Sequence, residues 1–212
     1  MGYFITLECI EGAGKSTVIA CLGEYLRDNN IDFILTHEPG GTEIAEKIRQ
    51  VLLAHYKEPM HPDTEMLLYF SGRAQHLNQV IIPALQLGKW VICDRFTDAT
   101  YAYQGGGRGL PQEKIAVLEQ WAQGDLRPDY TLLLDVAVDT GLDRIKKNRV
   151  LDRIEVEKES FFEKVRSCYL ARASVEPKRF QIVDANKTQQ EVELQVKDFL
   201  SKITVKNTIL QS

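Results

Sequence analysis

Several features that would point to a secreted, metal-binding or membrane protein are missing from this sequence. Its four cysteines form no Cys-x-x-Cys pair, and no two histidines stand three to five residues apart, which argues against a zinc site. No basic leader precedes a long apolar run, and no run approaches the roughly 20 apolar residues of a membrane span. We therefore expect a reduced, cytoplasmic protein without a membrane segment.

The sequence also lacks an excess of positive charge. It has 26 Lys and Arg residues against 30 Asp and Glu residues, which gives a formal net charge of −4 at pH 7. Binding along a nucleic-acid backbone depends on clustered Lys and Arg, so we expect no nucleic-acid partner. Any phosphate chemistry must then depend on a local site.

Internal repeats and low-complexity segments are absent, and apolar strand-like runs alternate with amphipathic stretches, as is typical of an α/β fold. At 212 residues we expect a single domain, 1–212. The predicted strands are 3–7, 31–36, 90–93, 130–134 and 179–183. The predicted helices are 15–29, 43–55, 63–87 with a bend near Pro83, 112–123, 139–147, 157–174 and 189–203. We expect a loop at 105–109, which holds four glycines, and a flexible tail at about 204–212.

The strongest motif lies between the first predicted strand and the first predicted helix. It is the P-loop sequence of residues 9–17, Cys9, Ile10, Glu11, Gly12, Ala13, Gly14, Lys15, Ser16 and Thr17. In the pattern G-x-x-x-x-G-K-[ST], backbone N–H groups surround phosphates, the lysine reaches the β- and γ-phosphates and the hydroxyl ligates Mg²⁺. Cys9 stands at the first glycine, so we expect an intact loop with altered nucleotide affinity. An ordinary glycine-rich turn is the alternative.

Two other strand ends carry residues suited to phosphate. Residues 38–42, Glu-Pro-Gly-Gly-Thr, follow the second strand, where the next helix could receive a second anion, although a plain connector explains them equally well. Asp94 and Arg95 end the third strand; the carboxylate could hold Mg²⁺-bound water and the guanidinium could bridge phosphate oxygens. Asp135, after the fourth strand, is a competing magnesium-side acid. Either aspartate could instead form a structural ion pair.

A charged segment at about 146–156 interrupts the helical pattern and could form a lid. Arginines on such a loop can close over a nucleotide and stabilise a transferring phosphoryl group, which makes Arg149 and Arg153 candidates. Taken by itself, however, a charge run is more often solvated surface.

The order of these motifs resembles that of bacterial thymidylate kinases, which are P-loop nucleoside-monophosphate kinases. The matches also include 73–75, 100–109 and 134–136, and they cover nearly the whole chain. The resemblance implies a three-layer P-loop NTPase fold, with a five-stranded parallel sheet flanked by helices and a short lid, and a homodimer. It also implies transfer of the γ-phosphoryl group of ATP to dTMP with Mg²⁺, giving dTDP and ADP for dTTP synthesis.

The same resemblance assigns an acceptor site. Tyr69 matches the ring stacked on thymine, Arg73 the hydrogen-bond partner of the base, and Thr100 a contact with the base edge. Tyr103 matches the tyrosine that crowds the sugar 2′-position, and Pro39 a wall of the base pocket. The implied substrate-binding residues are Glu38, Pro39, Arg49, Tyr69, Arg73, Arg95, Thr100, Tyr103 and Gln104, with Arg49 and Arg95 on the acceptor phosphate.

The family differs in whether its catalytic arginine lies in the P-loop or in the lid. Glu11 occupies the P-loop here, so the chain resembles the lid-arginine type, with Lys146 near the candidates. The implied catalytic residues are Lys15, Arg95, Arg149 and Arg153, and the implied magnesium-side residues are Ser16 and Asp94. One more departure is His37, where close relatives often have arginine.

Two other functions fit part of this pattern. A kinase for another nucleoside monophosphate or for a deoxynucleoside would have a different acceptor pocket. A regulatory protein that binds ATP without turnover would share only the P-loop. A GTPase is disfavoured, since the sequence contains no N-K-x-D guanine-reading tetrad.

Overall fold

The computed structural model describes residues 2–146 and 151–211. Its five strands form a parallel sheet in the order β2-β3-β1-β4-β5. The strands are β1 (Phe4–Cys9), β2 (Phe33–His37), β3 (Trp90–Asp94), β4 (Tyr130–Asp135) and β5 (Phe180–Asp184). The predicted α/β fold with a five-stranded parallel sheet is confirmed, and each strand runs one or two residues further at its carboxyl end than predicted.

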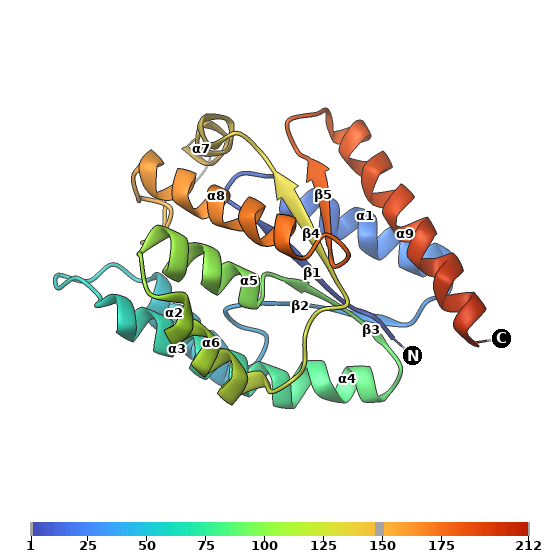
Figure 1. Ribbon diagram of the computed structural model, residues 1–212, viewed down its shortest axis with the longest axis horizontal. Helices are drawn as coiled ribbons and strands as arrows, with labels where there is room; N and C mark the ends of the chain where they lie inside the picture. Colours follow the sequence, from blue (N-terminus) through green and yellow to red (C-terminus); the bar gives the residue numbers. More distant parts are fainter. Residues whose placement is uncertain (1, 147–150, 212) are drawn as a thin grey trace.

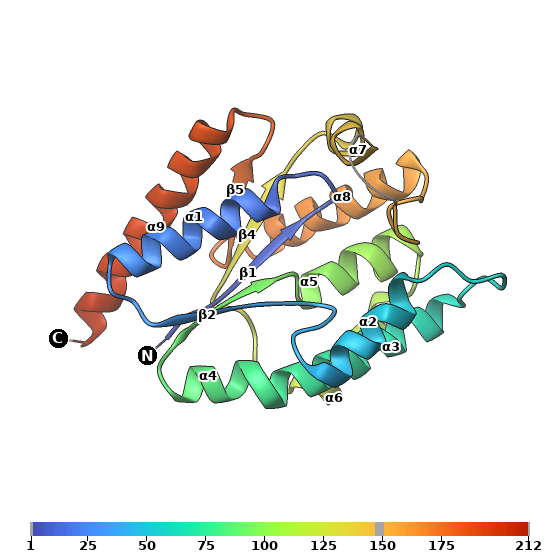
Figure 2. The same cartoon turned by 180° about the vertical axis from the view of Figure 1, so that it is seen from behind.

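Helices cover both faces of this sheet, so the fold has three layers. Figure 1 shows α8 in front of the sheet and α1 behind it, and Figure 2 shows the reverse, with α9 beside α1. The helices are α1 (Lys15–Asp28), α2 (Glu43–Leu53), α3 (Pro62–His76), α4 (Ile82–Gln86), α5 (Thr97–Thr100), α6 (Gln112–Gln123), α7 (Val138–Lys146), α8 (Glu159–Val175) and α9 (Gln189–Gln211), with π-helical turns η1 (Leu77–Ile81) and η2 (Tyr101–Gly107).

Strand β1 lies in the middle of the sheet and is buried along its whole length. All six residues of β1 are buried, because parallel strands covered on both faces meet no solvent. In register, Thr6 lies opposite Cys93 of β3 and Thr131 of β4. Because β1, β3 and β4 are neighbours, the segments that follow their carboxyl ends meet at one edge of the sheet, where ligands of open α/β sheets bind.

The predicted loop at 105–109 is wrong for its first three residues. The π-helical turn η2 continues through Gly107, and Arg108 and Gly109 donate backbone hydrogen bonds back to Tyr103 and Gly105. Tertiary packing outweighs the poor helix propensity of glycine here. A Cβ on Gly107 would lie 2.4 Å from the Phe161 ring, so only glycine lets η2 approach α8 this closely.

The helix predicted at 63–87 changes type just before Pro83, near the predicted bend or break. The long helix predicted at 63–87 consists of α3, η1 and α4, with Pro83 in the first turn of α4. Proline has no N–H to donate to the preceding turn, so the regular hydrogen-bond pattern changes just before it.

The predicted end of the last helix at residue 203 is wrong, because α9 continues to Gln211. Residues 204–211 contain neither proline nor glycine, so no local signal stops the helix at 203. Within the described residues, no helix has both the length and the apolar character needed to cross a bilayer. Arg149, a predicted lid residue, lies outside the described residues.

Candidate functional site

The P-loop connects β1 to α1 at the carboxyl edge of the sheet. Gly12 and Gly14 have positive φ angles of 75° and 90°, which L side chains rarely adopt, and Gly14 caps α1. Cys9 ends β1 in a strand conformation, so the first glycine of the pattern is not required for the backbone here. Burial raises the pKa of the Cys9 thiol, which therefore adds no charge beside a bound phosphate at pH 7.

The P-loop also touches α7 backbone to backbone. A Cβ on Gly12 would lie 2.0 Å from the carbonyl oxygen of Gly141, and a Cβ on Gly141 would lie 2.5 Å from the carbonyl oxygen of Glu11. Glycine at both positions therefore permits α7 to pack directly on the loop.

A cleft of about 700 Å³ opens above the P-loop. The residues that line it come from the P-loop, the ends of β2 and β3, α2, α3, α7 and the segment after residue 151. They are Cys9, Glu11, Gly12, Ala13, Gly14, Lys15, Ser16, His37, Glu38, Pro39, Arg49, Leu53, Tyr69, Asp94, Arg95, Arg144, Ile145, Asp152, Ile154 and Glu155. Two residues of the predicted ATP site are not among them: Ile10 is buried in the core and Thr17 lies further along α1. The structure thus brings the predicted donor and acceptor segments into one cleft.

Four charged side chains meet at the centre of this cleft. Lys15 Nζ lies 3.5 Å from Asp94 Oδ1, and Arg95 Nη2 donates to Glu11 Oε1 at 2.5 Å. Burial alone would raise the pKa of Glu11, but Arg95 and Lys15 outweigh it and lower the pKa to about 2. Glu11 is therefore a carboxylate throughout the physiological range.

The backbone of Arg95 is strained. Its φ of 66° is in the left-handed region, which costs a non-glycine residue about 1–2 kcal/mol. The strain is offset by contacts that direct the side chain into the cleft. The Arg95 N–H donates to Leu7 O at 2.9 Å, and the guanidinium donates to Tyr103 Oη at 2.9 Å. Its Nε is buried without a hydrogen-bond partner among the described residues.

A smaller cavity of about 20 Å³ adjoins the cleft. It is lined by Glu38, Pro39, Tyr69, Arg73, Arg95, Phe96, Ala99, Thr100, Tyr103 and Gln104. Eight of these are predicted substrate-binding residues, and Arg49, the ninth, lines the main cleft and donates to Pro39 O at 2.8 Å. The prediction that they share one site agrees with this arrangement.

Arg73 carries a donor that the protein leaves unused. The side chain is buried, with Nε donating to Glu38 Oε2 at 2.8 Å and Nη2 donating to Thr100 Oγ1 at 3.0 Å. Its Nη1 has no hydrogen-bond partner within the described part of the chain. A buried donor without a partner is costly, so it suits a ligand with an acceptor, such as a carbonyl group.

His37 and Gln104 have protein partners. His37 lines the cleft, and its Nε2 lies 2.8 Å from Glu46 Oε1. The buried Gln104 donates to Glu65 Oε1 at 2.7 Å. His37, which stands where close relatives often have arginine, is therefore held beside the cleft by its contact with Glu46 of α2.

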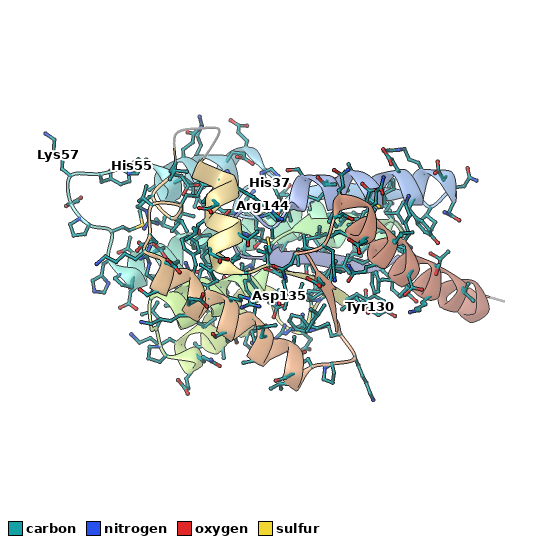
Figure 3. The ribbon with its side chains drawn as sticks, turned by 90° about the horizontal axis from the view of Figure 1, so that it is seen from above. His37, His55, Lys57, Tyr130, Asp135 and Arg144 are labelled. Carbon is teal, nitrogen blue, oxygen red and sulfur yellow. The ribbon has the colours of Figure 1, made fainter. Side chains whose placement is uncertain are left out.

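The two candidate magnesium-side acids have different surroundings. Asp94 lines the cleft, and its Oδ1 has no hydrogen-bond partner among the described residues. Asp135, labelled in Figure 3, accepts two hydrogen bonds from Arg166 at 2.6 and 2.9 Å and does not line the cleft. Asp94 and Ser16 both line the cleft and carry hard oxygen atoms, which is the ligand type that Mg²⁺ prefers.

Arg153 does not reach the P-loop. Its Nη1 donates to the buried carboxylate of Glu65 at 2.5 Å and its Nε to Leu52 O at 2.9 Å. Arg153 is thus held between α2 and α3, and it lines neither cavity.

The structure instead brings Arg144 of α7 to the cleft, a residue that the sequence analysis missed. Its Nη1 lies 3.4 Å from Gly12 O, and Figure 3 shows it projecting from α7 on the side of His37. The available signal was the spacing Gly141-x-x-Arg144, which puts Arg144 on the helix face where glycine allows close approach.

Comparisons with known proteins agree with this geometry. A family model described as Thymidylate kinase matches residues 7–196. A thymidylate kinase of Pseudomonas fluorescens is 58% identical over 184 residues, 87% of this chain and 88% of that protein. One of Ectopseudomonas mendocina is 54% identical over 95% of this chain and 96% of its own, and one of Nitrosomonas europaea 50% identical over 94% and 92%. With the P-loop, the second pocket and matches of this extent, the chain belongs to the thymidylate kinase family.

Proposed function

We propose that this chain transfers the γ-phosphoryl group of ATP to dTMP, giving dTDP and ADP for dTTP synthesis. One observation carries the proposal: the P-loop and a second pocket with a free buried donor open into the same cleft, with Arg95 lining both. A GTPase or a simple ATP-binding regulator has no need for the second pocket.

The acceptor side orients dTMP. Tyr69 stacks on thymine, and the free Nη1 of Arg73 donates a hydrogen bond to a carbonyl oxygen of the base. A base with an amino group at that position could not accept this hydrogen bond. Arg95 and Arg49 hold the acceptor phosphate, and Tyr103 lies beside the sugar. An oxygen of that phosphate is already anionic and nucleophilic, so the reaction requires no general base. Positioning and charge neutralisation therefore account for the rate.

The donor side holds ATP through the P-loop. Backbone N–H groups at the start of α1 bind the phosphates, and Lys15 neutralises charge on the transferring group. Ser16 and Asp94 would hold Mg²⁺, which would supply further neutralisation of phosphate charge. Asp94 lies beside Lys15 in the cleft, and its Oδ1 accepts no hydrogen bond among the described residues, which supports this assignment.

The lid side of the proposal has three arginines. Arg149 and Arg153 remain predicted lid residues, and Arg153 would have to leave Glu65 to reach the transferring group. Arg144 already lines the cleft beside Gly12.

Replacing Arg144 with alanine is expected to lower kcat and raise the KM for ATP, each by about tenfold, because a cation beside the donor phosphates is lost. The KM for dTMP should change by less than about twofold. Steady-state kinetics with each substrate varied in turn measures this, and Arg27→Ala, an exposed arginine at the end of α1, is the matched control. A rise in the dTMP KM alone would instead assign Arg144 to the acceptor site.

The proposed activity is tested by a coupled ADP-release assay with ATP and Mg²⁺ against dTMP, dUMP, dCMP, dAMP and dGMP. We expect the highest kcat/KM with dTMP. Preference for another monophosphate would contradict the assigned acceptor, and no ADP release with any of them would favour the binding-only alternative.

A homodimer in the cytoplasm is part of the proposal. Large apolar side chains are exposed on three helices that pack in the order α2, α3, α6: Ile44, Val51, Leu67, Val117 and Trp121. Trp121 is 82% exposed, and exposed apolar side chains gathered on neighbouring helices are typical of a protein interface. A reducing compartment suits four free cysteines.

Replacing Trp121 with glutamate is expected to convert a dimer of twice the chain mass of 24.1 kDa into a monomer, since a charge would be buried in the interface. Light scattering after size exclusion measures the mass. Leu194→Glu, an exposed leucine on α9, is the control and should leave the mass unchanged. A monomeric wild type, or a dimeric Trp121 variant, would contradict this interface.

A further inference from the structure

Glu8 is a charged residue type in an unusual place. It lies in the central strand β1, is fully buried, and does not line the substrate cleft. Its Oε1 accepts a hydrogen bond from the Phe96 N–H at 2.8 Å, and its Oε2 accepts one from the Tyr169 hydroxyl at 2.7 Å. Side chains of this type are rarely buried without a specific role, and the proposed reaction does not use Glu8 directly.

The contact with Phe96 fixes the peptide group that follows Arg95. At one end of this peptide, the Arg95 carbonyl accepts a hydrogen bond from the Cys93 thiol at 3.0 Å. At the other end, the Phe96 N–H donates to Glu8. Both polar groups of the peptide are therefore held, immediately after the left-handed φ of Arg95. A strained residue keeps such a conformation only where its surroundings enforce it.

The groups around Glu8 also determine its charge. Burial and the nearby carboxylate of Asp98 raise the pKa of Glu8 to about 8, while Tyr169, the Phe96 N–H and Arg95 oppose that rise. Glu8 in turn contributes to raising the pKa of the buried Cys93 thiol. Glutamine keeps the length of the Glu8 side chain and a carbonyl oxygen that can accept from the Phe96 N–H.

We propose that Glu8 is a positioning residue for Arg95: by holding the Arg95–Phe96 peptide, it keeps the Arg95 guanidinium directed at the acceptor phosphate. This inference rests on the proposed function, because it concerns binding of the dTMP phosphate. Glu8 itself lines neither the cleft nor the smaller cavity. Its loss should affect dTMP rather than ATP, since the P-loop backbone is not part of the contact.

The experiment compares Glu8→Leu, Glu8→Asp and Glu8→Gln. Leucine removes the acceptor, and we expect kcat/KM for dTMP to fall by about 10²-fold with the KM for ATP within about twofold, because a small displacement of a catalytic group is costly. Aspartate is one methylene shorter and should give an intermediate loss. Glutamine restores the acceptor for Phe96 and should restore most of the activity. Glu24→Leu, on the exposed face of α1, is the control.

Amide exchange at Phe96, followed by NMR, gives a readout that is independent of activity. Exchange should accelerate in the Leu and Asp variants and remain slow in the Gln variant. If the Leu variant does not fold, the Asp variant decides: unchanged dTMP kinetics or unchanged Phe96 exchange would overturn the proposal. A folded Gln variant as inactive as the Leu variant would also overturn it. Failure of the wild type to phosphorylate dTMP would contradict the proposed function instead. The exchange rate of the Phe96 amide would still test whether Glu8 holds the Arg95–Phe96 peptide.

Discussion

Lys15→Ala is expected to reduce turnover by about 10³-fold without loss of the fold. Lys15 begins α1, lines the cleft and lies 3.5 Å from Asp94, so its ammonium group lies where we propose that the donor phosphates bind. Removing one charge-stabilising donor from a site of this kind costs about 10²–10³-fold in kcat, and the role of the P-loop lysine is at the upper end of that range. Alanine is also the most favourable residue in a helix, so α1 should persist.

Steady-state kinetics measures this loss, and circular dichroism with a thermal melt measures the fold. The control is Lys89→Ala, which removes a lysine whose partner is the mostly exposed Asp32 and which does not line the cleft. The control should keep its activity within about twofold, since an exposed ion pair is worth little. If the Lys15 variant kept activity within tenfold of the wild type, the proposed role of Lys15 in neutralising phosphate charge would be contradicted.

Arg95→Ala is expected to lower kcat/KM for dTMP by about 10³-fold, which corresponds to about 4 kcal/mol of transition-state stabilisation. Arg95 lines both the main cleft and the smaller cavity, so its loss removes charge from the point where donor and acceptor meet. Arg95→Lys retains the charge but loses the planar bidentate geometry, and we expect an intermediate loss.

The Arg95 variant has a second effect that needs its own control. Glu11 would lose the partner that, together with Lys15, lowers its pKa to about 2, and a buried carboxylate without that partner destabilises the fold. The double variant Arg95→Ala/Glu11→Gln removes this carboxylate. It should regain the melting temperature lost in the single variant without regaining activity. Activity restored in the double variant would mean that the buried charge, and not the missing guanidinium, causes the defect.

The strands and the P-loop could be predicted because their signals are local. A run of apolar residues specifies a buried parallel strand, and the P-loop pattern contains its own backbone geometry. The order of the motifs also identified the family correctly. The convergence of Lys15 and Arg95 followed from their positions just after parallel strands, whose carboxyl ends share one edge of the sheet. The position of Arg73, in α3, was implied only by the family resemblance.

Tertiary contacts decided what the sequence left open. Asp94 and Asp135 both end apolar strands, and their surroundings differ because Asp135 is paired with Arg166 while Asp94 lines the cleft beside Lys15. Arg153 looked suited to a lid, but its partner Glu65 is 88 residues away in the chain. The helical turn through Gly107 depends on the neighbouring Phe161, which local propensity cannot reveal.

Because Gly12 and Gly141 are in contact, the same constraint on side-chain size applies to two positions that are far apart in the sequence. A side chain at either would have to push the P-loop and α7 apart, since each Cβ would fall within 2.5 Å of a backbone oxygen of the other element. A second substitution cannot relieve the overlap, because neither position has a side chain left to shorten. Both glycines should therefore be equally intolerant in a saturation library, and no pair of replacements should rescue activity. The position of Arg144 thus depends on glycine at two sites, Gly12 in the P-loop and Gly141 in α7, the helix that carries Arg144.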